Sequence, residues 1–401
     1  MTDTRSFAAL RYPRFRFYFL GAALAMMADS IEHVISYWII FQKFHSPALG
    51  GFAVLSHWLP FLLFSVYSGA LADRYDPRRV IQIGMALFMS VSFAWGLLFL
   101  TDTLEMWHAA ALLVVHGFAG VLWSPAGQIF IHDLVEEPQL HSAVRLVATS
   151  RWLGLLFGPA VGGAILLAAG PAYGILLNTL IYLPLVLWLW KTPYARKAAQ
   201  RPLRAIADII ATLREISGNR VILPMVLLAG GTSLLVGNAY QAQMPEFARD
   251  LGHAHADLNY SMLLAADAAG ALIAGLLLES RGLLQARAPT AFLLAMLWCV
   301  AIASFAAASS YALALVLLFA AGFLELSFNA MAQTLVQLNA PAQARGRVIG
   351  LYAMSGLGMR TFSGVTVGLG GQMIGIHWSL ALSAATLFLL VLSLSLVTRS
   401  R

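Results

Sequence analysis

The chain has 401 residues, of which 60% are hydrophobic and only 11% are charged. Its mean hydropathy of +0.78 excludes an ordinary soluble domain. The net charge of +7 comes mainly from cations in short polar segments between apolar stretches, so it requires no nucleic-acid partner. The only cysteine, Cys299, lies in an apolar stretch, which excludes a disulfide framework and a cysteine-rich metal site.

Apolar runs near 20 residues in length recur along the chain, with brief polar breaks between them. A helix of about 20 residues crosses the hydrocarbon core of a bilayer, so each run predicts a membrane-spanning helix. The first run is itself long enough to span, which argues against a cleaved signal peptide. We expect an all-α integral membrane protein with twelve spans, near 15–41, 48–71, 80–100, 106–131, 141–169, 172–190, 220–246, 258–279, 289–308, 311–336, 346–373 and 376–397.

The cations are segregated to one side of these spans. Of the 25 Lys and Arg residues, 21 fall in segments on one side, whereas the loops on the other side hold only Lys43 and Arg249. The positive-inside rule therefore predicts that both termini are cytoplasmic.

The longest internal polar stretch divides the twelve spans into six and six. We expect an N-terminal six-helix bundle at 1–190, a basic cytoplasmic linker at 191–219 and a C-terminal six-helix bundle at 220–401. Apolar residues recur at helical spacing within the linker, which predicts an amphipathic helix held at the surface of anionic membrane lipids.

The two halves resemble each other weakly. Gly69 and Asp73 follow the second span as Gly275 and Glu279 follow the eighth, with the acid four residues beyond the glycine in both. Such duplication predicts a transporter built from internal inverted repeats, with its substrate site between the two bundles near the bilayer midplane.

The segment from Gly69 to Arg79, Gly-Ala-Leu-Ala-Asp-Arg-Tyr-Asp-Pro-Arg-Arg, resembles the signature loop between helices 2 and 3 of the major facilitator superfamily. It departs from that pattern at Asp76 and Pro77, where the family has a glycine and an arginine. The resemblance implies the major facilitator fold, with this loop as a cytoplasmic gate. Asp73 is expected to accept hydrogen bonds at the N-terminus of a neighbouring helix. The expected gate residues are Gly69, Asp73, Arg74, Arg78, Arg79, Glu279 and Arg281.

Two further stretches narrow the resemblance. The segments 117–163, with Ser124-Pro125-Ala126, and 329–350, with Arg345-Gly346-Arg347-Val348, resemble bacterial drug and siderophore exporters that include enterobactin and macrolide efflux proteins. This resemblance implies an exporter in the bacterial inner membrane. The fifth span resembles the packing motif of proton-coupled drug antiporters, although the motif's earlier glycine is absent; the motif residues are Gly154, Gly158, Pro159, Gly162 and Gly163.

Ionisable residues inside the spans mark the expected site. The first span carries Asp29, Glu32 and His33 near the membrane midplane, where a charged group costs about 2.5–3.5 kcal/mol. Such groups must face a cavity, be paired or be neutral, and a buried carboxyl group that becomes neutral can exchange protons. In the fourth span His116 stands near the place of an arginine found in many relatives, and it can titrate instead. We therefore expect proton coupling at Asp29, Glu32, His33 and His116.

The resemblance also implies that helices 1, 4, 7 and 10 line the substrate cavity. In the tenth span three polar side chains recur every four residues and form one stripe. The expected substrate-binding residues are Asp29, Glu32, His33, His57, Asn238, Gln241, Glu325, Asn329 and Gln333. We interpret Asp267 and Arg360 as a structural ion pair, and we expect Arg151 to extend toward the inner membrane surface.

These observations predict a monomeric secondary transporter that exports amphipathic small molecules, such as drugs or siderophore-like metabolites, in exchange for protons. An uptake symporter and a divalent metal-ion exporter of the same fold are the first alternatives, and a non-transporting membrane receptor is the second. We predict no enzyme activity, no cofactor and no dedicated metal site, since nothing in the sequence shows that the histidines and carboxylates converge. No nucleotide-binding loop is present in the sequence.

Overall fold

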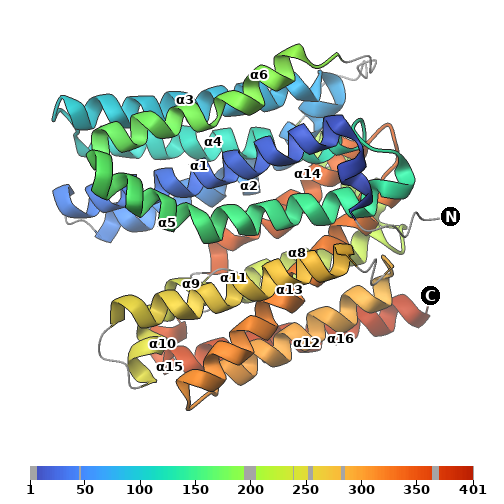
Figure 1. The fold of residues 1–401 in the computed structure, drawn as a ribbon. Coiled ribbons are helices and arrows are strands. Elements are labelled where there is room, and N and C mark those ends of the chain that lie inside the picture. The colour runs from blue at the N-terminus through green and yellow to red at the C-terminus, as the bar shows by residue number, and fades with distance from the viewer. Residues whose placement is uncertain are drawn as a thin grey trace.

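The computed structural model describes residues 7–44, 47–193, 205–237, 239–251, 256–280, 285–363 and 370–400. Within these ranges the chain is helical and contains no β-strand. Figure 1 shows two groups of helices, with the N-terminal half in blue to green above the C-terminal half in yellow to red. The predicted all-α, two-bundle architecture is confirmed.

Six spans form the N-terminal half. The long α5 contains the fifth span and the first part of the sixth, which continues in α6. The chain direction reverses within α5 (Figure 1) at Gly170, whose φ of 73° lies in the left-handed region that favours glycine. At the start of α3, Pro77 occupies the first turn and the Asp76 side chain accepts a hydrogen bond from the Arg78 backbone N–H, which caps the helix. The elements are η1 (Ala8–Arg11), α1 (Pro13–Phe44), α2 (Pro47–Arg74), α3 (Pro77–Leu100), α4 (Met106–Ile131), η2 (Glu137–Gln139), α5 (Leu140–Ile181) and α6 (Leu183–Lys191).

The linker region contains one helix, and the C-terminal half follows it. The linker helix α7 packs against α2 and α14, with Ile216 buried. The elements are α7 (Ala205–Ile216), α8 (Ile222–Leu235), α9 (Ala239–Ala242), α10 (Met244–Asp250), α11 (Ala256–Ser280), α12 (Ala288–Ala306), α13 (Tyr311–Asn339), α14 (Arg345–Gly356), η3 (Gly358–Phe362), α15 (Gly370–Ile374) and α16 (Ile376–Ser400).

Nine helices in the described part of the chain are long and apolar enough to cross a membrane. The other three expected spans correspond to the first half of α5, to the run α8–α10 and to the run α14–α15. The last two are broken into short helices. Discontinuous spans of this kind are common where transporters bind their substrates, since the broken backbone then lines a cavity.

The two halves meet along α2 against α14 and α5 against α11. Glycines allow this close contact: a Cβ atom on Gly69 would clash with the backbone of Gly346, and one on Gly275 with the side chain of Thr149. The space that remains between the halves, near the middle of the spans, holds the candidate site.

Candidate functional site

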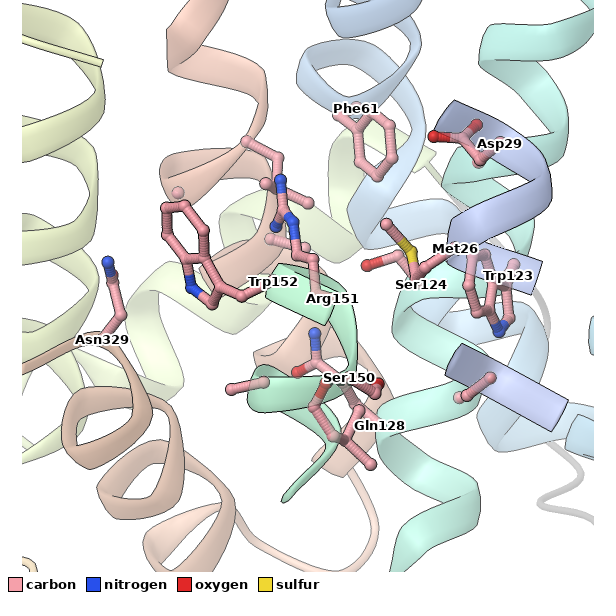
Figure 2. Close-up of a pocket in the computed structure, with 18 of the residues that line it drawn as sticks. Met26, Asp29, Phe61, Trp123, Ser124, Gln128, Ser150, Arg151, Trp152 and Asn329 are labelled. Atoms are coloured by element: carbon pink, nitrogen blue, oxygen red, sulfur yellow. Dashed lines mark hydrogen bonds between the residues drawn. The ribbon is translucent and has the colours of Figure 1, made fainter. Parts of the chain in front are cut away.

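A cavity of about 580 Å³ lies between the two halves. Its wall is formed by α1 to α5 on one side and by α13, α14, η3 and Gln241 on the other. Figure 2 shows Asp29 on α1 and Arg151 on α5 directed into this space, with Trp123, Trp152 and Phe61 around it. Aromatic walls with a few polar groups are typical of small-molecule sites.

An acid–imidazole cluster, formed by Asp29, Glu32, His33, His57 and His116, lies on the N-terminal side of the cavity. His116 Nε2 lies 3.0 Å from Asp29 Oδ1, and its Nδ1 lies 2.8 Å from Glu32 Oε1. The two acids, three residues apart on α1, therefore hold one imidazole between them. His33 Nδ1 donates to the Asp29 backbone carbonyl at 2.7 Å and lies 3.6 Å from Asp29 Oδ2.

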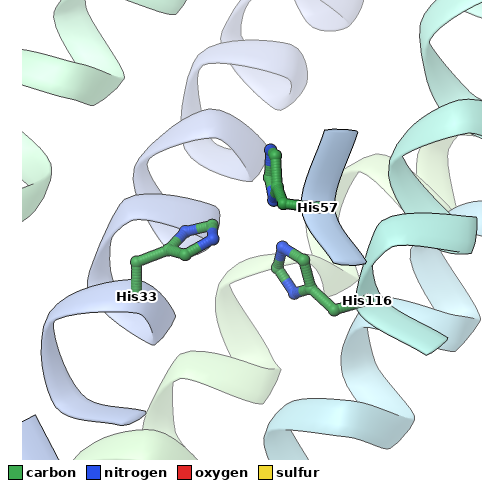
Figure 3. Close-up of side chains that lie close together, drawn as sticks. All are labelled: His33, His57 and His116. Carbon is green, nitrogen blue, oxygen red and sulfur yellow. The ribbon is translucent and has the colours of Figure 1, made fainter. Parts of the chain in front are cut away.

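The three imidazole rings converge from three helices. Figure 3 shows His33 on α1, His57 on α2 and His116 on α4 directed toward one another. The ring centroid of His33 lies 5.0 Å from that of His57 and 4.7 Å from that of His116. His57 Nδ1 is buried and has no hydrogen-bond partner. The four residues expected to couple protons and the expected substrate residue His57 thus share one cluster.

Glu32 corrects one expectation. Its side chain is only 2% exposed and points into the bundle, whereas Asp29, His33 and His57 line the cavity. Ser92 donates a hydrogen bond to Glu32 Oε2, and Asn178 Nδ2 donates to Ser92 Oγ at 3.2 Å. Glu32 therefore orients His116 from behind, and we no longer interpret it as a substrate contact. Ser92 and Asn178 were not predicted to take part. Both are polar residues inside apolar spans, the third and the sixth, and this feature could have identified them.

A second acidic group faces the cavity from the C-terminal half. The Tyr240 hydroxyl lies 3.2 Å from Asp267 Oδ2 and 3.4 Å from Glu325 Oε2. Gln241 Nε2 donates to Asp267 Oδ2 at 3.1 Å. The α13 stripe of Glu325, Asn329 and Gln333 lines the cavity as expected from its four-residue spacing. Asn238 lies outside the described residues.

The structure does not bring Asp267 and Arg360 together as an ion pair. Asp267 accepts hydrogen bonds from Tyr240 and Gln241, while the Arg360 guanidinium lies 5.1 Å from the centroid of the Trp58 ring. Residues at a similar depth in the membrane need not be close together, because Asp267 is on α11 and Arg360 is on η3, and each contacts other side chains. Arg151 also departs from its expected position, since it lines the central cavity instead of extending to the membrane surface.

At one end of the molecule, which we term the gate end, the turn between α2 and α3 contacts the N-terminus of α14. Asp73 accepts hydrogen bonds from the backbone N–H groups of Gly346 at 2.8 Å and Arg347 at 3.2 Å. A carboxylate at a helix N-terminus is favoured by both the free N–H groups and the helix dipole. This contact joins the two halves.

Glu279, the counterpart of Asp73 in the second half, makes a second link across the halves. Its carboxylate is 1% exposed and lies 2.9 Å from Arg145 Nη2, and it accepts a hydrogen bond from Ser142. The sequence did not predict that Arg145 pairs with Glu279, because the repeated motif contains only the glycine and the acid. Arg281 lies outside the described residues.

The arginines of the signature loop contact their own half. Arg74 lies 5.4 Å from the centroid of the Tyr75 ring, and Arg79 Nη1 donates to Gln82 Oε1 at 2.9 Å. Arg78 pairs with Asp76 at 2.6 Å. Asp76, which departs from the family pattern, therefore both caps α3 and holds an arginine of the loop.

Three of the four glycines of the fifth-span motif pack on α1. A Cβ atom on Gly154 would meet Met26, one on Gly158 would meet Ser30, and one on Gly162 would lie 3.3 Å from Ile31 Cα. Gly163 differs, since a Cβ atom there has nothing within 4 Å. The α5 backbone stays helical through Pro159, and its single non-helical position is Gly170.

Comparison with known proteins agrees with this architecture. The model of the Major Facilitator Superfamily matches residues 18–364. The chain therefore belongs to the major facilitator superfamily and is a multi-pass membrane protein.

A curated relative is the staphyloferrin A transporter of Staphylococcus aureus, which is 22% identical over 57% of this chain and 58% of its own length. The chain thus covers less than two thirds of the curated relatives it matches. Among solved structures, the human organic anion transporter MFSD10 aligns with a TM-score of 0.77 at 15% identity, over 97% of this chain and 99% of that one. A bacterial homologue of the iron transporter ferroportin in an outward-facing state aligns with a TM-score of 0.74 at 16% identity, over 97% and 100%.

Proposed function

We propose that this transporter exports amphipathic small molecules across a bacterial inner membrane in exchange for protons, by alternating access, with both termini in the cytoplasm. The observation that carries the proposal is the position of Asp29: its carboxylate opens into the central cavity and also contacts His116. A group in that position can respond to both a proton and a substrate. The siderophore transporter among the relatives supports an organic substrate, and the segregated cations support the orientation.

The proposed cycle uses the ionised Asp29 carboxylate to hold a hydrogen-bond-donating or cationic group of the substrate. A proton that arrives from outside neutralises Asp29 and weakens this interaction, so the substrate leaves. Loss of the proton toward the cytoplasm restores the site. The links through Asp73 and through Glu279 close the gate end, which we assign to the cytoplasmic side, while the substrate is released to the other side.

Reconstitution in proteoliposomes tests this proposal. Pyranine trapped in the vesicles reports internal pH while a panel of amphipathic drugs and siderophores is added. We expect compounds that are transported to move protons in the opposite direction, and a protonophore to abolish their pH-driven accumulation. Inverted and right-side-out vesicles separate export from uptake. Transport that is indifferent to the pH gradient would contradict proton coupling.

Divalent metal-ion export is the second candidate function, and one observation favours it. His33, His57 and His116 each offer one ring nitrogen, and these three atoms lie within 4.8 Å of one another. Imidazole and carboxylate groups suit divalent transition metals. His33 directs Nδ1 at the Asp29 backbone carbonyl, an arrangement that in metal sites orients the ring and leaves Nε2 for the metal. The convergence of the three rings was not visible in the sequence.

Titration of the purified protein with Co²⁺, followed by its visible absorption, tests the metal reading. If the cluster carries a metal ion as substrate, His57→Ala weakens binding strongly, and Glu32→Gln weakens it by about 10- to 100-fold because it removes the support of His116. His141→Ala, which changes a histidine outside the cavity lining, is the matched control. Equal Co²⁺ affinity in all four proteins would exclude metal transport through this cluster.

A further inference from the structure

Two cations stand apart from the segregation that orients the chain. Arg151 and Arg360 lie within spans and both line the central cavity, Arg151 from α5 and Arg360 from η3. Charged side chains at this depth are costly, so they mark functional sites unless a partner neutralises them. Arg151 and Arg360 therefore need a partner for their charge, either from the protein or from a bound molecule.

Neither guanidinium group has a carboxylate partner within the described part of the chain. Among the described residues, no ion pair or hydrogen bond joins either of them to another side chain, and Arg360 Nε is buried without an acceptor there. Arg145, on the same helix as Arg151, shows the contrast, because it is held by Glu279 through two nitrogen atoms. Unmet buried donors of this kind cost free energy unless a bound molecule supplies the acceptors.

Glu325 and Asp29 line the same cavity as the two arginines, but neither forms an ion pair with them within the described part of the chain. Glu325 interacts electrostatically with both groups, and Asp29 interacts with Arg151. The two guanidinium groups also repel each other. Tyr352, on α14, lines the same cavity as Arg360. A carboxylate placed between the arginines would relieve their repulsion and accept the unused N–H groups in the bidentate geometry that guanidinium groups favour.

The surroundings are aromatic as well as cationic. The Arg360 guanidinium lies 5.1 Å from the centroid of the Trp58 ring. Trp152 is the chain neighbour of Arg151 and lines the same cavity, as Figure 2 shows. A molecule held by the arginines would therefore place its apolar body against these rings.

We propose that Arg151 and Arg360 form an anion subsite that binds the carboxylate of an amphipathic organic anion, with Asp29 holding a donor group elsewhere on the same molecule. This inference rests on the proposed function and names its substrate class. Asp29 lines the cavity from α1 and the arginines line it from α5 and η3, so the preferred substrates carry an anionic group and a separate donor group on an apolar frame.

Thermal unfolding of the full chain in detergent, with naphthaleneacetate and its neutral amide as matched probes, tests the subsite. The carboxylate should raise the melting temperature as its concentration rises, and more than the amide does. Arg151→Met and Arg360→Met should each weaken the apparent affinity for the carboxylate by about 10-fold or more. Arg249→Met, at an arginine whose side chain is 67% exposed, should leave the effect unchanged.

Melting temperatures without a probe separate a binding role from a structural one. Arg145→Met should lower the melting temperature, since it strands the buried Glu279 carboxylate. Arg151→Met and Arg360→Met should leave it unchanged or raise it, because each removes a cation inside a span that forms no ion pair within the described part of the chain and that the other arginine repels. Destabilisation equal to that of Arg145→Met, equal effects of carboxylate and amide, no stabilisation by the carboxylate, or a carboxylate effect that survives in both variants would overturn the subsite.

The outcomes also separate this inference from the export proposal. Asp29→Asn should lose proton-driven flux and retain the preference for the carboxylate probe. Proton-driven flux without any carboxylate preference would overturn the anion subsite while leaving the export proposal standing. A carboxylate preference without proton-driven flux would support the anion subsite and overturn the export proposal.

Discussion

Replacement of Asp29 by asparagine is expected to abolish accumulation of substrate driven by a pH gradient. Asparagine keeps the shape of the side chain but cannot lose or gain a proton at neutral pH, so the proton no longer alters substrate binding. One pH unit corresponds to about 1.4 kcal/mol, or about tenfold accumulation for exchange of one proton. The variant should therefore show none of the roughly tenfold gradient per pH unit that we expect of the unmodified protein, measured in proteoliposomes.

Asp102→Asn provides the matched control. Asp102 is exposed at the end of α3, where Lys43 Nζ lies 2.7 Å from its Oδ1. The hydrogen bond and charge of Lys43 hold the pKa of the Asp102 carboxyl below its ordinary value, so this group stays ionised at neutral pH and has no part in proton exchange. If Asp29→Asn accumulates substrate as well as Asp102→Asn does, Asp29 is not the coupling residue.

Valine in place of Gly69 is expected to block closure of the gate end and so to stop transport. In this conformation a Cβ atom at Gly69 meets the backbone carbonyl of Gly346, which cannot rotate away as a side chain could. Overpacking of a close contact costs about 1–3 kcal/mol. Because the contact joins the two halves, that cost shifts the equilibrium away from the closed gate by roughly 5- to 150-fold.

Spin labels at Tyr75 and Leu338, exposed positions on the two halves, measure this shift as a distance distribution. The Gly69→Val population should move to longer distances, and flux should fall in proportion. Gly163→Val is the control, since a Cβ atom at this glycine has nothing within 4 Å. An unchanged distance distribution in Gly69→Val would show that the close contact does not control the gate.

Parts of the candidate site were predictable because their chemistry is local in sequence. Asp29 and His33 are one turn apart and were expected to lie on one face of a helix, as the structure shows. The stripe of Glu325, Asn329 and Gln333 was predictable for the same reason. Glu32 belongs to the same turn and was expected to contact substrate, but its side chain is directed into the bundle toward Ser92 and does not line the cavity.

Pairings between distant segments were not predictable from depth alone. Asp267 and Arg360 lie at similar positions along their helices, yet Asp267 binds Tyr240 and Gln241 while Arg360 lies over Trp58. The partnership of Arg145 with Glu279 was likewise hidden, since it joins helices that are 134 residues apart in the chain. Each of these contacts depends on which face of a helix is turned toward its neighbour. That orientation cannot be predicted from a span that is apolar on all sides, because no face differs from the others.

The sequence by itself determined the membrane-spanning, all-α, two-bundle architecture, because span length acts through the bilayer and needs no tertiary contact. The placement of its cations predicts the orientation in the same way. The sequence also identified the few ionisable residues inside the spans, where a charged group is costly and therefore marks a candidate functional site. Only the tertiary structure decided which of them meet. It placed His33, His57 and His116 together, directed Glu32 into the bundle, and put Arg151 and Arg360 in a shared cavity, where neither forms an ion pair with a described residue. The physical reason is that hydrogen bonds and ion pairs act over a few ångströms, and helix packing sets those distances between residues far apart in the chain.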